Sequence, residues 1–185
     1  LEQVEHQTPL CERSRTPVEF IVSEAWYLKQ LEFRDALRTL ANEMEFHPPR
    51  HRQLLLDWID SLTIDWPISR RRYYHTEIPL WYCKGCGHIL VPPAGKYYRP
   101  WRDSAPFDRC PECAGRDFVG EDCVFDTWMD SSNSNLWVTG YRKDDAFFEA
   151  NFPTALRPQG REIVRTWLYY TTRKSFLLRG RKPFR

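Results

Sequence analysis

The sequence contains no long apolar run. None of its segments approaches the roughly 18 to 20 consecutive apolar residues that are needed to cross a bilayer. The first ten residues, LEQVEHQTPL, have neither the basic start nor the apolar core of a secretory signal peptide. We therefore predict a cytoplasmic protein. The chain also lacks a Met at its first position and a targeting signal at its last residues, so we expect a fragment of a longer polypeptide.

A large excess of charge of either sign is also absent. The chain has 27 Lys and Arg residues against 25 Asp and Glu residues, a formal charge of +2, which is too small to indicate nucleic-acid binding by itself. Basic side chains gather only locally, in SRRRYYH at 69–75 and RGRKPFR at 179–185. A solvated charged surface is the simpler interpretation of the second cluster, and it is one of two interpretations of the first, beside a contact with phosphates.

Apolar periodicity predicts the elements of the first third of the chain. The segment VEFIVSEAWYL, residues 18–28, alternates apolar and polar side chains and is rich in β-branched residues, so we predict a strand. Apolar residues at helical spacing predict amphipathic helices at 33–45 and 50–62. The prolines at 48 and 49 separate these two helices, because proline lacks a backbone donor and restricts the residue before it.

The last third of the chain predicts a strand and a helix joined by glycine. ALRPQG at 155–160 is expected to be a short strand, and REIVRTWLYYTTRKSFLL at 161–178 a long helix. Strand, glycine and helix in this order are typical of parallel α/β sheets, where ligands gather at the carboxyl ends of the strands. We therefore predict an α/β fold.

The segment between these regions is rich in Cys, Gly and Pro. Two Cys-x-x-Cys pairs lie in residues 81–122, and we divide the chain into segments 1–80, 81–122 and 123–185 accordingly. Two such turns can complete a tetrahedron around Zn²⁺ with bonds of about 2.3 Å and leave no open position, so the metal would be structural. Two disulfides or four ordinary thiols are the alternatives. The predicted zinc ligands are Cys83, Cys86, Cys110 and Cys113.

Two further cysteines lie outside these pairs. Cys11 is followed by Ser14 where a third Cys-x-x-Cys would need a thiolate, so we expect an inert turn. Cys123 has no histidine or basic neighbour in sequence, and we expect a small buried residue rather than a nucleophile.

Three stretches together resemble the catalytic region of the valyl-tRNA synthetases, a family of class I aminoacyl-tRNA synthetases. They are WPISRRRYYHTEIPLWYC at 66–83, CVFDTWMDSSNSNLW at 123–137 and LRPQGREIVRTWLYYT at 156–171. The segments SRRRYY and TEIPLWYC most resemble those of archaeal members. The resemblance implies the C-terminal half of a Rossmann-type catalytic domain with an inserted zinc-ribbon-like module. The chain would then run from just after the editing insertion to just before the Lys-Met-Ser-Lys-Ser loop.

The resemblance also implies roles for particular residues. Such enzymes activate valine with ATP and Mg²⁺ and transfer it to tRNA(Val), and the parent enzyme is expected to be monomeric. Gly160 and Glu162 match positions that approach the adenosine and the ribose of ATP, although Arg161 between them departs from the usual histidine or aromatic residue. Trp128 and Ile163 match positions that wall the amino-acid pocket. The positions that match a basic segment near the tRNA acceptor end are Arg70, Arg71 and Arg72.

Two signature motifs of class I synthetases do not occur in these 185 residues. His-x-Gly-His and Lys-Met-Ser-Lys-Ser hold the phosphates of ATP in such enzymes, so we expect the chain alone not to catalyse adenylation, and we assign no catalytic residue to it. The alternative is a separate zinc-ribbon module that binds RNA and has no enzymatic activity.

Overall fold

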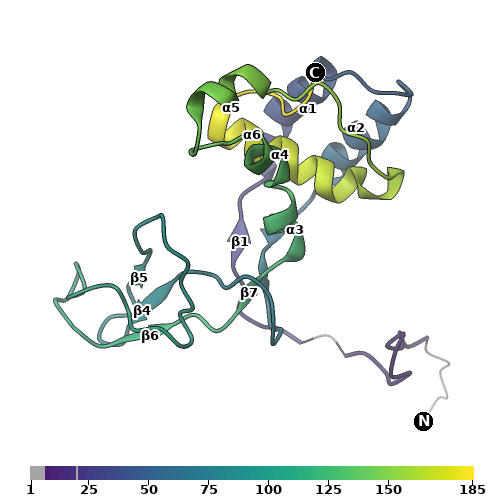
Figure 1. The fold of residues 1–185 in the computed structure, drawn as a ribbon. Helices are drawn as coiled ribbons and strands as arrows, with labels where there is room; N and C mark the ends of the chain where they lie inside the picture. The colour runs from purple at the N-terminus through teal and green to yellow at the C-terminus, as the bar shows by residue number, and fades with distance from the viewer. Residues whose placement is uncertain (1–6, 20) are drawn as a thin grey trace, which may run out of the picture.

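Two amphipathic helices lie side by side in the upper part of Figure 1. The computed structural model describes residues 7–19 and 21–185. Helices α1 (Arg34–Glu43) and α2 (His51–Ser61) follow a 3-10 turn, η1 (Leu31–Phe33). Helix α1 buries Leu37, Leu40 and Ala41 on one face, as their spacing predicts. Both predicted helices are confirmed.

A third helix near the C-terminus packs on α1 and α2. It starts as a 3-10 turn, η2 (Arg161–Ile163), passes through a π-helical turn, η3 (Val164–Leu168), and continues as α6 (Tyr169–Arg179). The predicted helix at 161–178 is therefore confirmed. Apolar residues of all three helices form one buried cluster, to which the rings of Tyr170 and Trp66 add a stack with centroids 3.7 Å apart. This cluster is the main core of the protein.

The strand predicted at 18–28 is wrong for most of its length. Only β1 (Tyr27–Leu28) pairs, antiparallel to β2 (Trp66–Pro67). Ile21 and Val22 are 79% and 105% exposed, and Phe20 lies outside the described residues. A strand needs a neighbouring backbone to complete its hydrogen bonds, and the described part of the chain brings none beside residues 21–25.

The strand predicted at 155–160 is also wrong. These residues form no strand, and the pairing next to them is a single parallel bridge between Thr154 and Phe184. The backbone N–H of Thr154 donates to the carbonyl of Pro183 over 3.1 Å. Pairing stops there because no described segment lies alongside residues 155–160 to continue it.

Short strands and helices follow the three packed helices α1, α2 and α6 in space and lead toward the Cys-rich segment (Figure 1). Strand β3 (Ser69–Arg70) pairs antiparallel to β7 (Val124–Phe125), and three short helices follow, α3 (Thr127–Ser131), α4 (Ser134–Val138) and α5 (Asp145–Asn151). The carboxylate of Asp126 caps α3 by accepting the N–H of Trp128 at 2.9 Å. Residues 123–126 therefore lead from the sheet directly into the capped start of a helix.

The Cys-rich segment forms a small antiparallel sheet at the far end from α1, α2 and α6 (Figure 1). Its strands are β4 (Trp81–Cys83), β5 (Ile89–Leu90) and β6 (Phe118–Gly120), in the order β5-β4-β6. Trp81 is 1% exposed and meets the rings of Tyr98 and Phe107 edge-on. We call residues 81–122 the cysteine module.

One carboxylate ties this module to the rest of the protein. Glu121, 8% exposed, accepts hydrogen bonds from the Trp26 ring N–H, at 2.8 Å, and from the Tyr82 hydroxyl. It also accepts the backbone N–H groups of Asp122 and Cys123. Because Trp26 precedes β1, this network joins the module to the rest of the protein.

Among the helices of the described residues, none is long and apolar enough to span a membrane.

Candidate functional site

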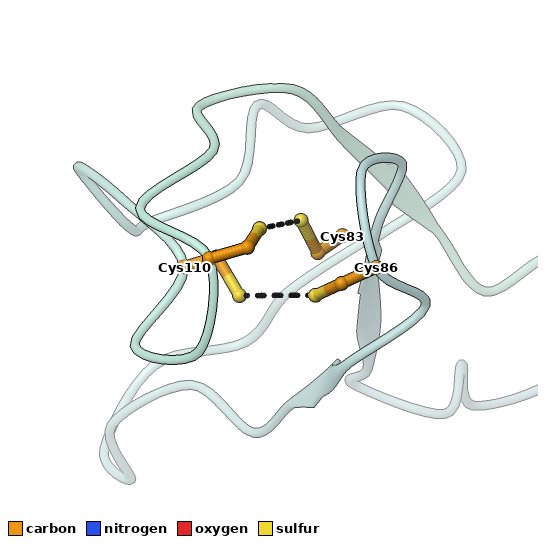
Figure 2. Close-up of side chains that lie close together, drawn as sticks. Cys83, Cys86 and Cys110 are labelled. Atoms are coloured by element: carbon orange, nitrogen blue, oxygen red, sulfur yellow. Dashed lines mark hydrogen bonds between the residues drawn. The ribbon is translucent and has the colours of Figure 1, made fainter.

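The four cysteines of the two Cys-x-x-Cys pairs converge at one point of the module (Figure 2). Their sulfur atoms all lie within 4.8 Å of one another. The Sγ atoms of Cys83 and Cys113 are 3.5 Å apart, and those of Cys86 and Cys110 are 3.6 Å apart. Zn–S bonds of about 2.3 Å in a tetrahedron separate the sulfurs by about 3.8 Å. The four thiols therefore fit one tetrahedral metal ion.

Both Cys-x-x-Cys turns have the same backbone hydrogen bonds. In the first, the N–H of Gly87 donates to the carbonyl of Cys83 at 2.8 Å; in the second, the N–H of Ala114 donates to the carbonyl of Cys110 at 2.9 Å. Gly87 and Ala114 have φ of 73° and 57°, in the left-handed region that glycine adopts most easily. These turns aim both sulfurs of a pair to the same side.

The thiols differ in their pKa values. Backbone N–H groups, first that of Cys86, lower the pKa of Cys83 to about 7, and the backbone N–H of Cys113 lowers the pKa of Cys110, whereas contacts among the thiols raise the pKa of Cys86 to about 12 and raise that of Cys113. A Cβ added to Gly115 would lie 3.2 Å from the Sγ of Cys113, so the backbone approaches the centre too closely for a larger residue. The donor set and the space around it fit a closed zinc site.

Cys11 lies in a turn of the same form without a second thiol. The N–H of Arg15 donates to the carbonyl of Cys11 at 2.8 Å, and Arg15 has φ of 59°. Ser14 occupies the place of the second cysteine, and its hydroxyl lies 2.6 Å from that of Thr16. The turn thus keeps its backbone shape but offers one sulfur ligand.

Cys123 is half-buried, so the prediction of a buried residue is wrong. It follows β6 at the edge of the module, where Glu121 fixes its backbone. Burial and the neighbouring Glu121 carboxylate raise the pKa of this thiol to about 11. The thiol is therefore protonated at neutral pH, and that it is not a nucleophile stays a prediction.

The residues matched to nucleotide contacts lie at the start of η2. Glu162 folds back so that its carboxylate lies over Gly160, in space that a Cβ at this position would fill. Both residues are exposed. Glu162 lines a cavity of about 320 Å³ together with Leu54, Arg161 and Arg165. Arg161 also lines a second cavity of about 340 Å³, whose wall includes Arg157.

Trp128 and Ile163, the residues matched to the amino-acid pocket, lie on adjoining elements. Both are half-buried and pack against the main core. Trp128 is in α3, and Ile163 is the last residue of η2, which runs on into η3. The ring N–H of Trp167 in η3 donates to the carbonyl of Ser131 in α3 at 2.8 Å, which holds η3 to α3. The packing alone would suit two ordinary core residues as well as a pocket wall.

The three arginines of the basic segment differ in what they contact. Arg70 pairs with Asp126 and donates to the carbonyls of Pro67 and Ser69 at 2.8 Å. Arg71 and Arg72 are exposed. The guanidinium of Arg70 therefore holds β3 to the cap of α3, and the exposed pair faces solvent.

The sequence reasoning missed a large cavity beside this segment. It has a volume of about 760 Å³ and lies between residues 72–77 and the module loop that carries Tyr97, Arg99 and Trp101. The two tyrosines that directly follow the arginines in RRRYYH were the local signal for one of its walls. Its second wall comes from residues 97–101, more than twenty residues further along the chain. No local sequence pattern indicates that these residues lie beside the first wall.

Comparison with known proteins assigns the chain to a family. Residues 4–185 match the family described as tRNA synthetases class I (I, L, M and V). The chain belongs to this family. As a class I tRNA synthetase segment it has the α and β content that the sequence predicts.

Two archaeal relatives match this chain over its whole length. It is 49% identical to a valine–tRNA ligase of Aeropyrum pernix and 47% identical to one of Pyrobaculum aerophilum, with 100% of this chain covered in both cases. The chain spans 23% and 24% of the length of these two relatives. A solved LeuRS of Agrobacterium radiobacter K84, in a ternary complex with tRNA and LeuAMS, is 25% identical over 66% of this chain and 19% of that chain, with a TM-score of 0.49.

Proposed function

We propose that this chain is part of the catalytic region of a valyl-tRNA synthetase, which activates valine with ATP and passes it to tRNA(Val). The observation that carries the proposal is the match of the whole chain, at 49% and 47% identity, to valine–tRNA ligases of two archaea. The family profile alone leaves isoleucine, leucine, methionine and valine open. The RPQG at 157–160, followed by an acidic residue and isoleucine, also favours the valyl branch.

The chain would contribute to both substrate sites of that enzyme. Trp128 and Ile163 form an apolar wall against the valine side chain; their half-burial on adjoining elements supports this role. Gly160 lets the nucleotide approach the backbone, and Glu162 binds the ribose. The exposed Glu162 carboxylate beside a cavity supports that assignment. Carboxylates accept ribose hydroxyls through strong, charge-assisted hydrogen bonds.

The same proposal assigns a Rossmann-type sheet to the complete catalytic domain. The parallel bridge between Thr154 and Phe184 supports it, because parallel pairing beside a following helix is the connection that such sheets use. ATP with Mg²⁺ would bind at the carboxyl ends of the strands of that sheet.

The cysteine module would hold one structural zinc ion in a zinc-ribbon-like arrangement. Cys83, Cys86, Cys110 and Cys113 supply all four ligands, so the metal stabilises the module and leaves no position for a substrate. Arg71 and Arg72 would contact tRNA phosphates, whereas Arg70 is committed to Asp126. A separate zinc-ribbon RNA-binding module is the weaker candidate, because the family match extends over residues 4–185 rather than over the module alone.

A chimeric enzyme tests the proposed function. Residues 1–185 replace the matching segment of the Aeropyrum pernix valine–tRNA ligase, and ATP–pyrophosphate exchange is measured with each of valine, isoleucine, leucine and methionine. We expect exchange that depends on valine. A folded, zinc-containing chimera that responds to another of these amino acids, or to none, would contradict the proposal.

A further inference from the structure

Aromatic side chains gather at the cavity between residues 72–77 and the module loop. Tyr73 and Tyr74 are 106% and 89% exposed on one side, and Tyr97 and Trp101 are 62% and 59% exposed on the other. Large apolar rings of this kind are costly to leave in water. Four of them around one cavity of about 760 Å³ provide flat faces for a planar ligand.

A buried carboxylate holds two of these rings in place. Glu77 is 8% exposed, and its two oxygens accept hydrogen bonds from the hydroxyl of Tyr97 and, at 3.2 Å, from the ring N–H of Trp101. The guanidinium of Arg99 in turn lies 5.4 Å from the centre of the Tyr97 ring. The wall that the module contributes is therefore already arranged without a ligand.

The charges of the cavity select which part of a nucleotide can enter. Arg72 and Arg99 line it together with the carboxylates of Glu77, Asp122 and Asp130. His75 also lines it, with its Nδ1 atom 3.3 Å from a carboxylate oxygen of Asp130. Because carboxylates outnumber the guanidinium groups, a phosphate inside the cavity would be repelled. A neutral base avoids this cost, and its amino groups can donate to the two aspartates.

Phosphates instead have a place at the rim. Arg71 and Arg72 are exposed and directly precede the first pair of rings in sequence. Aromatic faces beside exposed arginines are the combination that binds single-stranded nucleic acid, with bases stacked on rings and the backbone along the basic groups.

We propose that this cavity binds an unpaired base of single-stranded RNA, stacked between the tyrosines of residues 73–74 and the Tyr97–Trp101 wall, with the adjoining phosphates on Arg71 and Arg72. The inference rests on the proposed function in so far as RNA is a partner of that function. It adds a specific site, formed jointly by the module and the segment before β4.

Fluorescence anisotropy with a labelled single-stranded RNA, penta-adenylate, tests the proposal on the zinc-loaded chain at about 50 mM salt. Tyr74→Ala should weaken binding about 5- to 150-fold, because each base–aromatic stack contributes that much, and Tyr74→Phe should restore it. Tyr74 is almost fully exposed, so its removal does not disturb folding. Trp137→Ala, which removes an exposed ring outside the cavity, is the matched control and should leave the affinity unchanged.

An abasic oligomer of the same length separates base binding from charge attraction. We expect it to bind far more weakly than penta-adenylate. Equal binding of the two oligomers, an unchanged affinity of Tyr74→Ala, or no binding of penta-adenylate would each overturn the inference. The exchange assay on the chimera contains no RNA, so the proposed function stands or fails independently of these results.

Discussion

Glu121 connects three parts of the chain through a single carboxylate. Its oxygens accept donors from Trp26, from Tyr82 and from the backbone of residues 122–123. Burial alone would raise its pKa, but these hydrogen bonds outweigh burial and lower the pKa of Glu121 to about 2. The ionised form is therefore part of the folded structure.

This shift predicts how stability depends on pH. Because the folded pKa lies below the value of about 4.3 expected for an unfolded chain, the contribution of Glu121 is complete above that pH and is lost as pH falls toward 2. Glu121→Gln should lower the free energy of unfolding by about 2 kcal/mol at pH 7. Denaturant titrations at several pH values measure both effects.

The exposed Glu24 provides the matched control. Glu24→Gln should leave both the unfolding free energy and its pH dependence unchanged. If Glu121→Gln behaved in the same way at pH 7, the hydrogen-bond network would not stabilise the fold as described.

At the scale of elements, the cysteine module has only a small hydrophobic core. Its buried cluster contains Cys83, Leu90 and Cys110, with Phe107 and Phe118 packed against it. So few apolar residues cannot offset the conformational entropy of about forty ordered residues. The free energy of metal binding has to supply the difference.

Cys110→Ser should therefore unfold residues 81–122 and leave α1, α2 and α6 protected. Hydrogen exchange locates the loss of structure, and metal analysis should give one zinc per wild-type chain and less in the variant. Cys11→Ser is the control, because its turn offers a lone thiol, and it should keep the zinc. If metal analysis found no zinc in freshly reduced wild-type protein, the proposal that a metal stabilises the module would be contradicted.

The same elements show what the sequence predicts and what it does not. Helix α1 was predictable because the spacing of Leu37, Leu40 and Ala41 is a local property. The convergence of the cysteine pairs followed from their spacing as well. The absence of the strand predicted at 155–160 could not be read from the sequence, because a strand forms only when a neighbouring backbone is present, and that depends on distant residues. The cavity and the Glu121 network join distant segments and leave no local pattern.

At the scale of the whole molecule, the chain is proposed to contact two substrates but does not contain the two phosphate-binding motifs of class I enzymes. Interactions with the developing charge usually contribute most to catalysis, and each lost donor costs about a hundred- to a thousandfold in rate. The isolated chain should therefore show no valine-dependent pyrophosphate exchange. If the purified chain did catalyse valine-dependent pyrophosphate exchange, residues other than those two motifs would have to carry out adenylation.

The central claim is that this chain holds the valine wall and the ribose contact of ATP, and titrations of two variants of the chimeric enzyme test it most directly. Glu162→Gln should raise the KM for ATP about 10- to 150-fold, through the loss of a charge-assisted hydrogen bond, with little change for valine. Trp128→Ala should raise the KM for valine, leave that for ATP nearly unchanged and relax discrimination against isoleucine. If both variants lost stability while the ratio of the two KM values stayed the same, Glu162 and Trp128 would be structural residues and the claim would be contradicted.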